Sequence, residues 1–401
     1  MLNLLKNLTD KMDRKKGRDK SDSFFFYHHI NDPRWTQCRY DALSEEGFQK
    51  NVVAFRSVNL IAKGVASIPI SVVNCDDGTE NSIATNLLKN PTPRQGRGTF
   101  FENIVNYLLI AGNAFVHYCS LSDDDMDNRR KCGAFHEELA TLNCLRPDRM
   151  QIIPDATKTG VKSYVYAVDV TKFSLAKEDV LHLKFFNPLN DWYGFGPMQA
   201  AMSAIDQHNA MSKHNLAILQ NGGRPSGCLM VKGGMENLTQ EQREQLREDI
   251  RNSYIGSKNA GKVLVLEGNF EWKEMGLSPK DLDFETGKNI TSREIAMAFG
   301  VPPMLVGIPG DSTFTSYREA RLHLWEDTIL PLAESIRLEF SAWLSQKISR
   351  QVELAFNLDD VHALTLRREI IWNRISQADF LDDAEKRSLL GFSPTTDKIQ
   401  N

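Results

Sequence analysis

Apolar residues recur at helical spacing in two stretches of the first half of the chain, Glu46–Ala66 and Thr99–Ala111. Short runs of β-branched and aromatic residues, separated by turn residues, predict strands around these helices. The strands are expected at Ile70–Val73, Ala114–Cys119, Leu139–Leu145, Met150–Ile153, Tyr164–Val170 and Val180–Phe186. Because helices and strands are mixed in this order, the pattern predicts an α+β fold for the first half.

Two long helices, Pro197–Asn221 and Pro279–Phe299, dominate the second half. At 1.5 Å per residue they span about 37 Å and about 31 Å. A small module lies between them, with strands expected at Gly227–Lys232, Lys262–Leu266 and Phe270–Met275 and a helix from Thr239. Two helices of similar length that flank an insertion fit an antiparallel pair with the module at its far end. The middle of the first helix, Asp206–Asn215, is polar, so one face is expected to meet water or a partner.

A breaker-rich stretch, Pro302–Thr315, follows the second long helix. Loops of this length in compact domains are usually functional. A third long helix is expected from Ser316, with Glu319 completing its cap, to Ile348, with a kink at Pro331. One strand, Gln351–Phe356, and a helical tail complete the expected order of elements.

Composition narrows the class of protein. The chain has 401 residues and 41% are hydrophobic, which is enough for a sizeable core. Its 48 Lys and Arg against 52 Asp and Glu give a net charge of -4, which argues against a tight nucleic-acid binder. No apolar run reaches the ~18 residues of a membrane-spanning helix, and the start lacks the apolar core of a secretory signal. We therefore expect a protein made in a reducing cytosol, with its six cysteines as buried thiols.

The first thirty residues form an N-terminal arm that contains the aromatic run Phe24–His29. Several exposed aromatic side chains in a row would favour aggregation of a monomer. The arm is therefore expected to dock, either under the body of its own chain or on a neighbouring subunit.

Motifs that carry chemistry are weak. Gly256–Lys262 has the spacing of a phosphate-binding loop, but Val263 replaces the expected Ser or Thr, and the motif follows a helix and enters a strand instead of the reverse. A plain surface turn explains it better. Four residues of the types that bind zinc lie close in the sequence: Cys119, Cys132, His136 and Cys144. Their spacing fits no compact zinc site, so no metal is expected.

Glu271 and Lys273 lie two apart on an expected strand and could serve a magnesium-dependent nuclease. Alternation offers another interpretation, in which Phe270 and Trp272 face the core while the two charged residues face water. No convincing acidic partner lies upstream. A nuclease stays as one alternative, and a monomeric α+β binding module is the other.

Six segments resemble the portal proteins of tailed bacteriophages, in the HK97-type family that also occurs in prophages and gene transfer agents. They are Asn51–Ile70, Tyr107–Tyr118, Leu145–Pro154, Asp179–Ala201, Asn221–Gly227 and Arg293–Gly310. Their joint order, relative to the helices, the insertion and the loop, is highly specific. The resemblance covers roughly Asn31–Ile348.

The resemblance implies a portal protein fold, with an α/β wing, a two-helix stem, a small α/β clip, a tunnel loop and a reduced helical crown. The implied division is 1–30 N-terminal arm, 31–196 wing, 197–223 first stem helix, 224–277 clip, 278–300 second stem helix, 301–316 tunnel loop, 317–358 kinked helix and strand returning to the wing, and 359–401 short helical C-terminal region.

The resemblance further implies a ring, usually of twelve copies, at one capsid vertex of the virion. A separate terminase ATPase packages double-stranded DNA through this ring, and the DNA later leaves by the same channel. The implied partners are the terminase large subunit, the major capsid protein and scaffold, head-tail connector proteins, and DNA contacted without sequence specificity. Assembly in the bacterial host cytoplasm is expected, with no membrane, no cofactor and no enzymatic activity.

Two groups of residues become candidate sites through the resemblance. The tunnel-loop residues nearest the DNA would be Ile308, Pro309, Gly310, Asp311, Ser312 and Thr313. Lys213, Lys288 and Arg293 are candidate channel or inter-subunit charges of the stem, and solvent-exposed helix charges are an equally good interpretation. The near-neutral net charge suits a conduit, because strong phosphate pairing would hold the DNA back.

Overall fold

The computed structural model describes residues 35–120, 140–157, 159–220, 227–231, 239–241, 244–245, 248, 270–274, 283–309 and 314–389. The chain divides into two units, Met1–Trp35 and Thr36–Asn401. Of the first unit only Trp35 is described, so the aromatic run of the expected arm lies outside the described residues. The second unit contains all the helices and strands discussed below.

The helix expected at Glu46–Ala66 is interrupted in the structure. A short α2 (Tyr40–Ala42) continues into a π-helical turn, η2 (Leu43–Gln49), and α3 (Val52–Ser67) follows. The break falls at Asn51, whose side-chain oxygen accepts hydrogen bonds from the backbone N–H groups of Val53 and Ala54. Apolar periodicity alone did not reveal this break, because the spacing of apolar residues continues across the capping residue.

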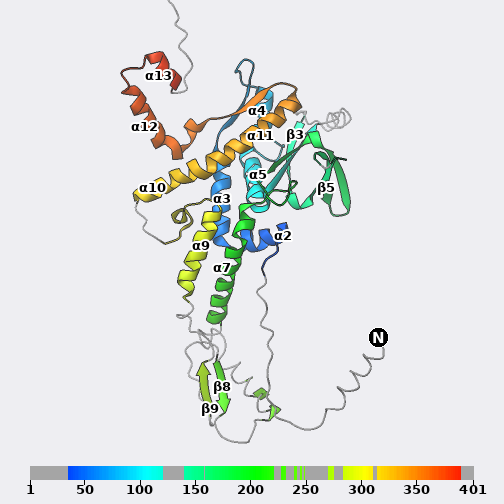
Figure 1. Cartoon of the computed structure of the whole chain (residues 1–401), viewed down its shortest axis with the longest axis vertical. Helices are drawn as coiled ribbons and strands as arrows, with labels where there is room; N and C mark the ends of the chain where they lie inside the picture. Colours follow the sequence, from blue (N-terminus) through cyan, green and yellow to red (C-terminus); the bar gives the residue numbers. More distant parts are fainter. Residues whose placement is uncertain are drawn as a thin grey trace, which may run out of the picture. The chain divides into compact units, whose positions relative to one another are not determined.

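Two helices, α3 and α5 (Arg97–Ala111), pack against each other at the centre of the core (Figure 1). Their facing side chains include Ile61, Phe100 and Ile104, all fully buried. A short helix, α4 (Ser82–Lys89), precedes α5 and begins at Asn81, which accepts a hydrogen bond from the backbone N–H of Ala84. The helix expected at Thr99–Ala111 is confirmed as α5.

Antiparallel strands form three small sheets in this body. The first has the order β3-β2-β7, the second β4-β5-β6, and the third pairs β1 with β10. The strands are β1 (Ile70–Asn74), β2 (Asn113–Ser120), β3 (Ala140–Leu145), β4 (Met150–Pro154), β5 (Val161–Val168), β6 (Thr171–Ala176), β7 (Val180–Lys184) and β10 (Val352–Phe356). Of these only β6 was not expected. Nearly all of its side chains are exposed, although Lys172–Leu175 alternates polar and apolar residues.

The two long helices of the second half are α7 (Pro197–Gln220) and α9 (Phe284–Ala298), which lie side by side (Figure 1). The first matches its predicted range. The second begins later than predicted, because Asp283 is its N-cap and accepts a hydrogen bond from the backbone N–H of Thr286 at 3.4 Å. The predicted first residue, Pro279, lies outside the described residues.

Two strands of the inserted module, β8 (Gly227–Val231) and β9 (Phe270–Glu274), were both predicted as strands, and the structure pairs them antiparallel. The expected strand Lys262–Leu266 and most of the helix expected from Thr239 lie outside the described residues.

The third long helix starts at Phe314, two positions before the predicted Ser316, and has three parts. These are α10 (Phe314–His323), a π-helical stretch η7 (Leu324–Ile329) and α11 (Leu330–Ile348). Pro331 stands in the first turn of α11, directly after the π-helical stretch. Proline removes one helical hydrogen bond, so the change of helical geometry here agrees with the irregularity predicted at this residue.

The C-terminal region is helical, with α12 (Thr365–Ser376) and α13 (Asp383–Leu389) as its described helices. Strand β10 precedes it and pairs with β1, so Val352 lies opposite Asn74 and Phe356 opposite Ile70. This pairing joins the two ends of the described chain in one body, from which α7, β8, β9 and α9 form an insertion in the sequence.

Candidate functional site: the paired helices and the loop that follows them

The paired helices bury one end and expose the other. Met202, Ile205 and His208 of α7 are buried, whereas Leu216 and Leu219, nearer its C-terminal end, are 54% and 68% exposed. On α9, Ile290 and Met297 are 52% and 74% exposed. Both helices therefore present large apolar side chains to solvent.

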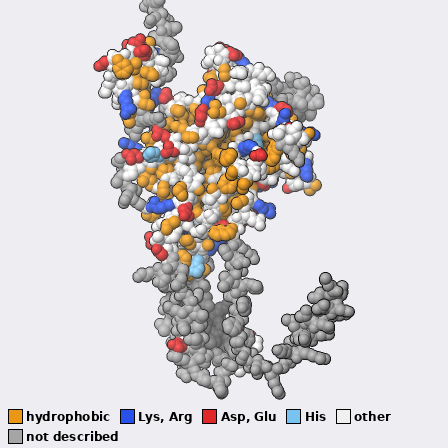
Figure 2. All heavy atoms as spheres, in the orientation of Figure 1, with side chains coloured by type: hydrophobic (Ala, Val, Ile, Leu, Met, Phe, Trp, Pro, Cys, Tyr) orange, Lys and Arg blue, Asp and Glu red, His pale blue; other side chains and the backbone are white. Residues whose placement is uncertain are grey.

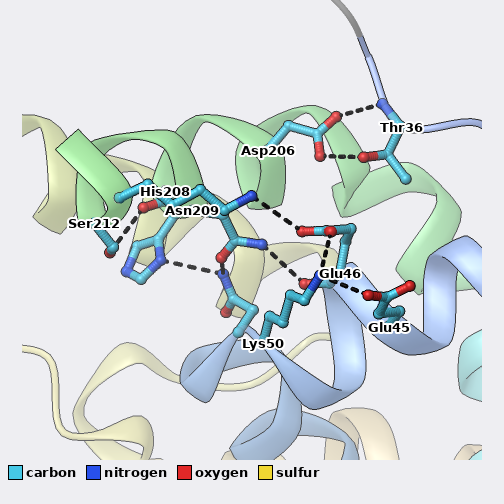
Figure 3. A network of polar contacts seen from close by, with 10 residues as sticks. Thr36, Glu45, Glu46, Lys50, Asp206, His208, Asn209 and Ser212 are labelled. Carbon is cyan, nitrogen blue, oxygen red and sulfur yellow. Dashed lines mark hydrogen bonds and ion pairs between the residues drawn. The ribbon is translucent and has the colours of Figure 1, made fainter. Parts of the chain in front are cut away.

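A buried amide network fixes the buried end of α7 (Figure 3). Asn51 is 1% exposed, and its oxygen caps α3, so its amide nitrogen must be the donor on the other side. That nitrogen lies 3.1 Å from Nδ1 of His208 and donates to the side-chain oxygen of Asn209 at 3.1 Å. Asn209 in turn donates to the backbone carbonyl of Glu46 at 2.9 Å. One residue thus links the start of α3 to the middle of α7.

The network also fixes the protonation of His208. Because Asn51 is the donor, Nδ1 of His208 must accept, and the ring is neutral with its proton on Nε2. Burial lowers the pKa of His208, and the positive charge of Lys288 lowers it further. One face of the polar middle of α7 is exposed, as expected, with Gln207, Lys213 and His214 on it. His208 and Asn209 are directed into the protein.

Exposed charges surround this network. Lys213, a candidate channel charge, forms an ion pair with Glu46 at 3.6 Å and has a side chain that is 68% exposed. Lys50 donates to Glu46 at 2.7 Å, and this hydrogen bond holds the pKa of Glu46 below its usual value. Lys213 therefore has an acidic neighbour within its own subunit.

The other two candidate charges lie on α9. Lys288 is exposed, and its positive charge acts on His208. Arg293 is also exposed but donates from Nη2 to the backbone carbonyl of Pro309 at 2.7 Å. The structure thus brings together two residues that the sequence placed in different groups, a stem charge and a tunnel-loop residue.

The first part of the expected tunnel loop is held closely to the body. Gly300 adopts a left-handed conformation with φ of 67°, and its carbonyl accepts a hydrogen bond from Oγ1 of Thr328 at 2.7 Å. Val301 and Leu305 are buried, and Ile308 is only 9% exposed. Ile308 therefore packs into its own subunit, while Pro309 is exposed. Gly310, Asp311, Ser312 and Thr313 lie outside the described residues.

A second well-ordered loop, between Phe185 and Gly196, was not singled out by its chemistry in the sequence. Asn113, 5% exposed, accepts from the backbone N–H of Gly194 at 2.7 Å and contacts Nε2 of His182 at 3.1 Å. Two further asparagine side chains, Asn187 and Asn190, hold the loop from within. In the sequence, the asparagine and glycine residues at turn positions are the signal that could have predicted this ordered loop.

This ordered loop presents apolar side chains to solvent. Phe186 is 85% exposed and Leu189 is 95% exposed. Apolar side chains are spread widely over the displayed face of the described region (Figure 2). Exposed large apolar groups on a well-ordered loop are typical of protein contact surfaces.

The described residues give little support to the nuclease site, the zinc site or the phosphate-binding loop. Glu271 and Lys273 lie on β9 opposite Met230 and Cys228. Cys119 and Cys144 lie on the neighbouring strands β2 and β3, while the other two zinc-ligand candidates and the phosphate-loop motif are outside the described residues. Within the described ranges no group of three or more His, Cys, Asp or Glu could hold a metal ion, and no helix is long and apolar enough to span a bilayer.

Comparison with known proteins agrees with this architecture. The phage portal protein family model matches residues 52–391. A chain from the neck of an empty gene transfer agent particle is 38% identical, with a TM-score of 0.68 over 91% of this chain and 96% of that chain. A chain from the neck of the native particle, computed with C12 symmetry, is 38% identical with a TM-score of 0.66 over the same shares. The portal protein of Enterobacteria phage HK97 is 24% identical over 79% of this chain and 73% of its own length.

The arrangement defines a portal fold. It combines a body of small antiparallel sheets, two long helices with two strands inserted between them, and a loop after the second helix that is hydrogen-bonded to the body. The chain belongs to the phage portal protein family. Proteins of this family are structural channel proteins and not enzymes, which confirms the expectation of a non-enzymatic protein and removes the nuclease alternative.

Proposed function

We propose that twelve copies of this chain form a ring at one vertex of a phage-type capsid and that double-stranded DNA passes through its centre. The observation that carries this proposal is the 38% identity, over 91% of the chain, to a protein of a gene transfer agent neck with C12 symmetry. A cyclic ring needs two different contact surfaces on each subunit. The exposed apolar side chains of α7, α9 and the Phe185–Gly196 loop supply surface suited to such contacts.

In this proposal the parts of the chain have separate roles. The body is the wing, α7 and α9 are the stem, and the inserted module is the clip, where the terminase large subunit docks during packaging and head-tail connector proteins dock afterwards. The wing contacts the major capsid protein and scaffold. The ring is assembled in the host cytoplasm and remains in the virion.

The tunnel loop is the proposed DNA-facing segment, with Pro309, Gly310, Asp311, Ser312 and Thr313 nearest the duplex. The contact is not specific for sequence, and the net charge of -4 allows DNA to slide because few phosphates are neutralised. Lys213 and Lys288 are proposed to face the channel or a neighbouring subunit.

Particle mass and shape test the ring. The purified chain has a mass of 45.4 kDa, so twelve copies give about 545 kDa, with a central hole in images of single particles. A species of 45.4 kDa alone, even with scaffold present, contradicts the proposal. Deleting Ile308–Thr313 is expected to leave the rings intact and reduce packaged DNA, and unchanged packaging contradicts the role of the loop.

A further inference from the structure

We propose that Arg293 and Thr328 are positioning residues that clamp the two ends of the segment Gly300–Pro309, the first part of the tunnel loop, and so set the point from which the rest of the loop leaves the body. The inference rests on the proposed function of that loop. It changes the role of Arg293, which the sequence offered as a charge for DNA or for a neighbouring subunit.

The two anchors come from different elements. At the start of the segment, Oγ1 of Thr328 in η7 donates to the carbonyl of Gly300 at 2.7 Å. At its end, Nη2 of Arg293 in α9 donates to the carbonyl of Pro309 at 2.7 Å. Both acceptors are backbone oxygens, so each bond fixes the path of the main chain itself.

Internal hydrogen bonds and buried side chains also stabilise the segment between the two anchors. The backbone N–H of Leu305 donates to the carbonyl of Pro302 at 3.0 Å, and that of Ile308 donates to the carbonyl of Pro303 at 3.3 Å. Val301, Leu305 and Ile308 bury their side chains, with exposures of 2%, 7% and 9%. The segment is therefore a short ordered platform, with Pro309 at its exposed end.

Gly300 supports the same interpretation. Its φ of 67° disfavours residues with a side chain, and a Cβ atom added there would lie 2.7 Å from Oγ1 of Thr328. The close approach that makes the first anchor possible therefore requires glycine. A guanidinium group suits the second anchor, because its planar donors can reach a backbone carbonyl while the remaining donors stay in water.

The decisive comparison uses the uncharged anchor. Thr328→Val removes the hydroxyl with little change of shape, and Thr328→Ser keeps it. Arg293→Met removes the other donor, and Arg321→Met is the control that removes one exposed positive charge from α10, the helix that follows the loop. Each variant is made in the full chain. The variant rings are compared by hydrogen exchange of the Leu305 and Ile308 amides and by DNA content of particles that contain only that variant.

If the clamp is correct, Thr328→Val and Arg293→Met each speed amide exchange about tenfold and lower packaged DNA severalfold, with rings still formed. Thr328→Ser and Arg321→Met behave like the wild type. If Arg293→Met alone lowers packaging, Arg293 acts through its charge and the proposal is wrong. Unchanged exchange in both anchor variants also overturns it. Wild-type rings that never take up DNA would contradict the proposed function instead, and the exchange rates would still decide whether the clamp exists.

Discussion

Replacing Asn51 by alanine tests whether the buried amide network holds α7 to the body. The change removes the cap of α3, which costs about 1 kcal/mol. It also leaves two buried acceptors, Nδ1 of His208 and the side-chain oxygen of Asn209, without the donor that lies 3.1 Å from each. An unsatisfied buried group costs about 1–3 kcal/mol, so the cap and the two acceptors together give an expected loss of unfolding free energy of about 3–7 kcal/mol.

The assay is urea unfolding of the purified chain, followed by helical circular dichroism. Asn59→Ala is the matched control, because Asn59 lies on the same helix and its amide donates only to the backbone carbonyl of Phe55 at 2.8 Å. The control should change the unfolding free energy by less than about 0.5 kcal/mol. A loss below about 1 kcal/mol for Asn51→Ala, with an unchanged slope against urea, would refute the reasoning that these acceptors depend on Asn51.

Three further predictions concern the body. Burial lowers the pKa of His182 to about 3, so the folded protein keeps it neutral while the unfolded chain takes up a proton below about pH 6.5. The unfolding free energy should therefore fall by up to about 1.4 kcal/mol per pH unit as the pH drops from 6.5 to 5. Urea titrations of His182→Gln at several pH values should lack the contribution of His182 to this pH dependence. Changing both Phe186 and Leu189 to serine should weaken ring formation without changing the melting temperature, whereas Ile83→Ser, at an 81% exposed position, should leave the mass of the particle unchanged in sedimentation. Gly194→Ala places a Cβ atom 2.2 Å from a backbone carbonyl oxygen, so it should cost about 1–3 kcal/mol in urea unfolding.

The sequence predicted most elements because their signals are local. The range predicted for α7, Pro197–Asn221, agrees with the observed Pro197–Gln220 to within one residue, because proline favours the first turn of a helix and glycine follows its end. Strand β6, whose side chains are nearly all exposed, was missed. Helix α9 was predicted to begin at Pro279, whereas it begins at Phe284 after the N-cap Asp283. Element type was therefore more predictable than element boundaries.

The site was less predictable because its contacts join residues far apart in the chain. Arg293 is recognisable in the sequence only as a cation on a helix, and nothing local shows that it donates to a carbonyl sixteen residues later. Asn51 likewise looks like one polar position in an apolar pattern, whereas its partners His208 and Asn209 lie more than 150 residues away. Such roles depend on the tertiary arrangement and not on local sequence.

The pairing of β1 with β10 has a consequence for the order in which this protein can be made. Val72 is fully buried in the structure and lies opposite Leu354, which leaves the ribosome only after both long helices and the module between them. Pairing over so large a sequence separation is slow to form. During translation β1 must therefore wait with an unpaired edge, and a chain cut short before Val352 would never close its core. Completion of the body is thus a late event, so that only full-length chains become available for assembly.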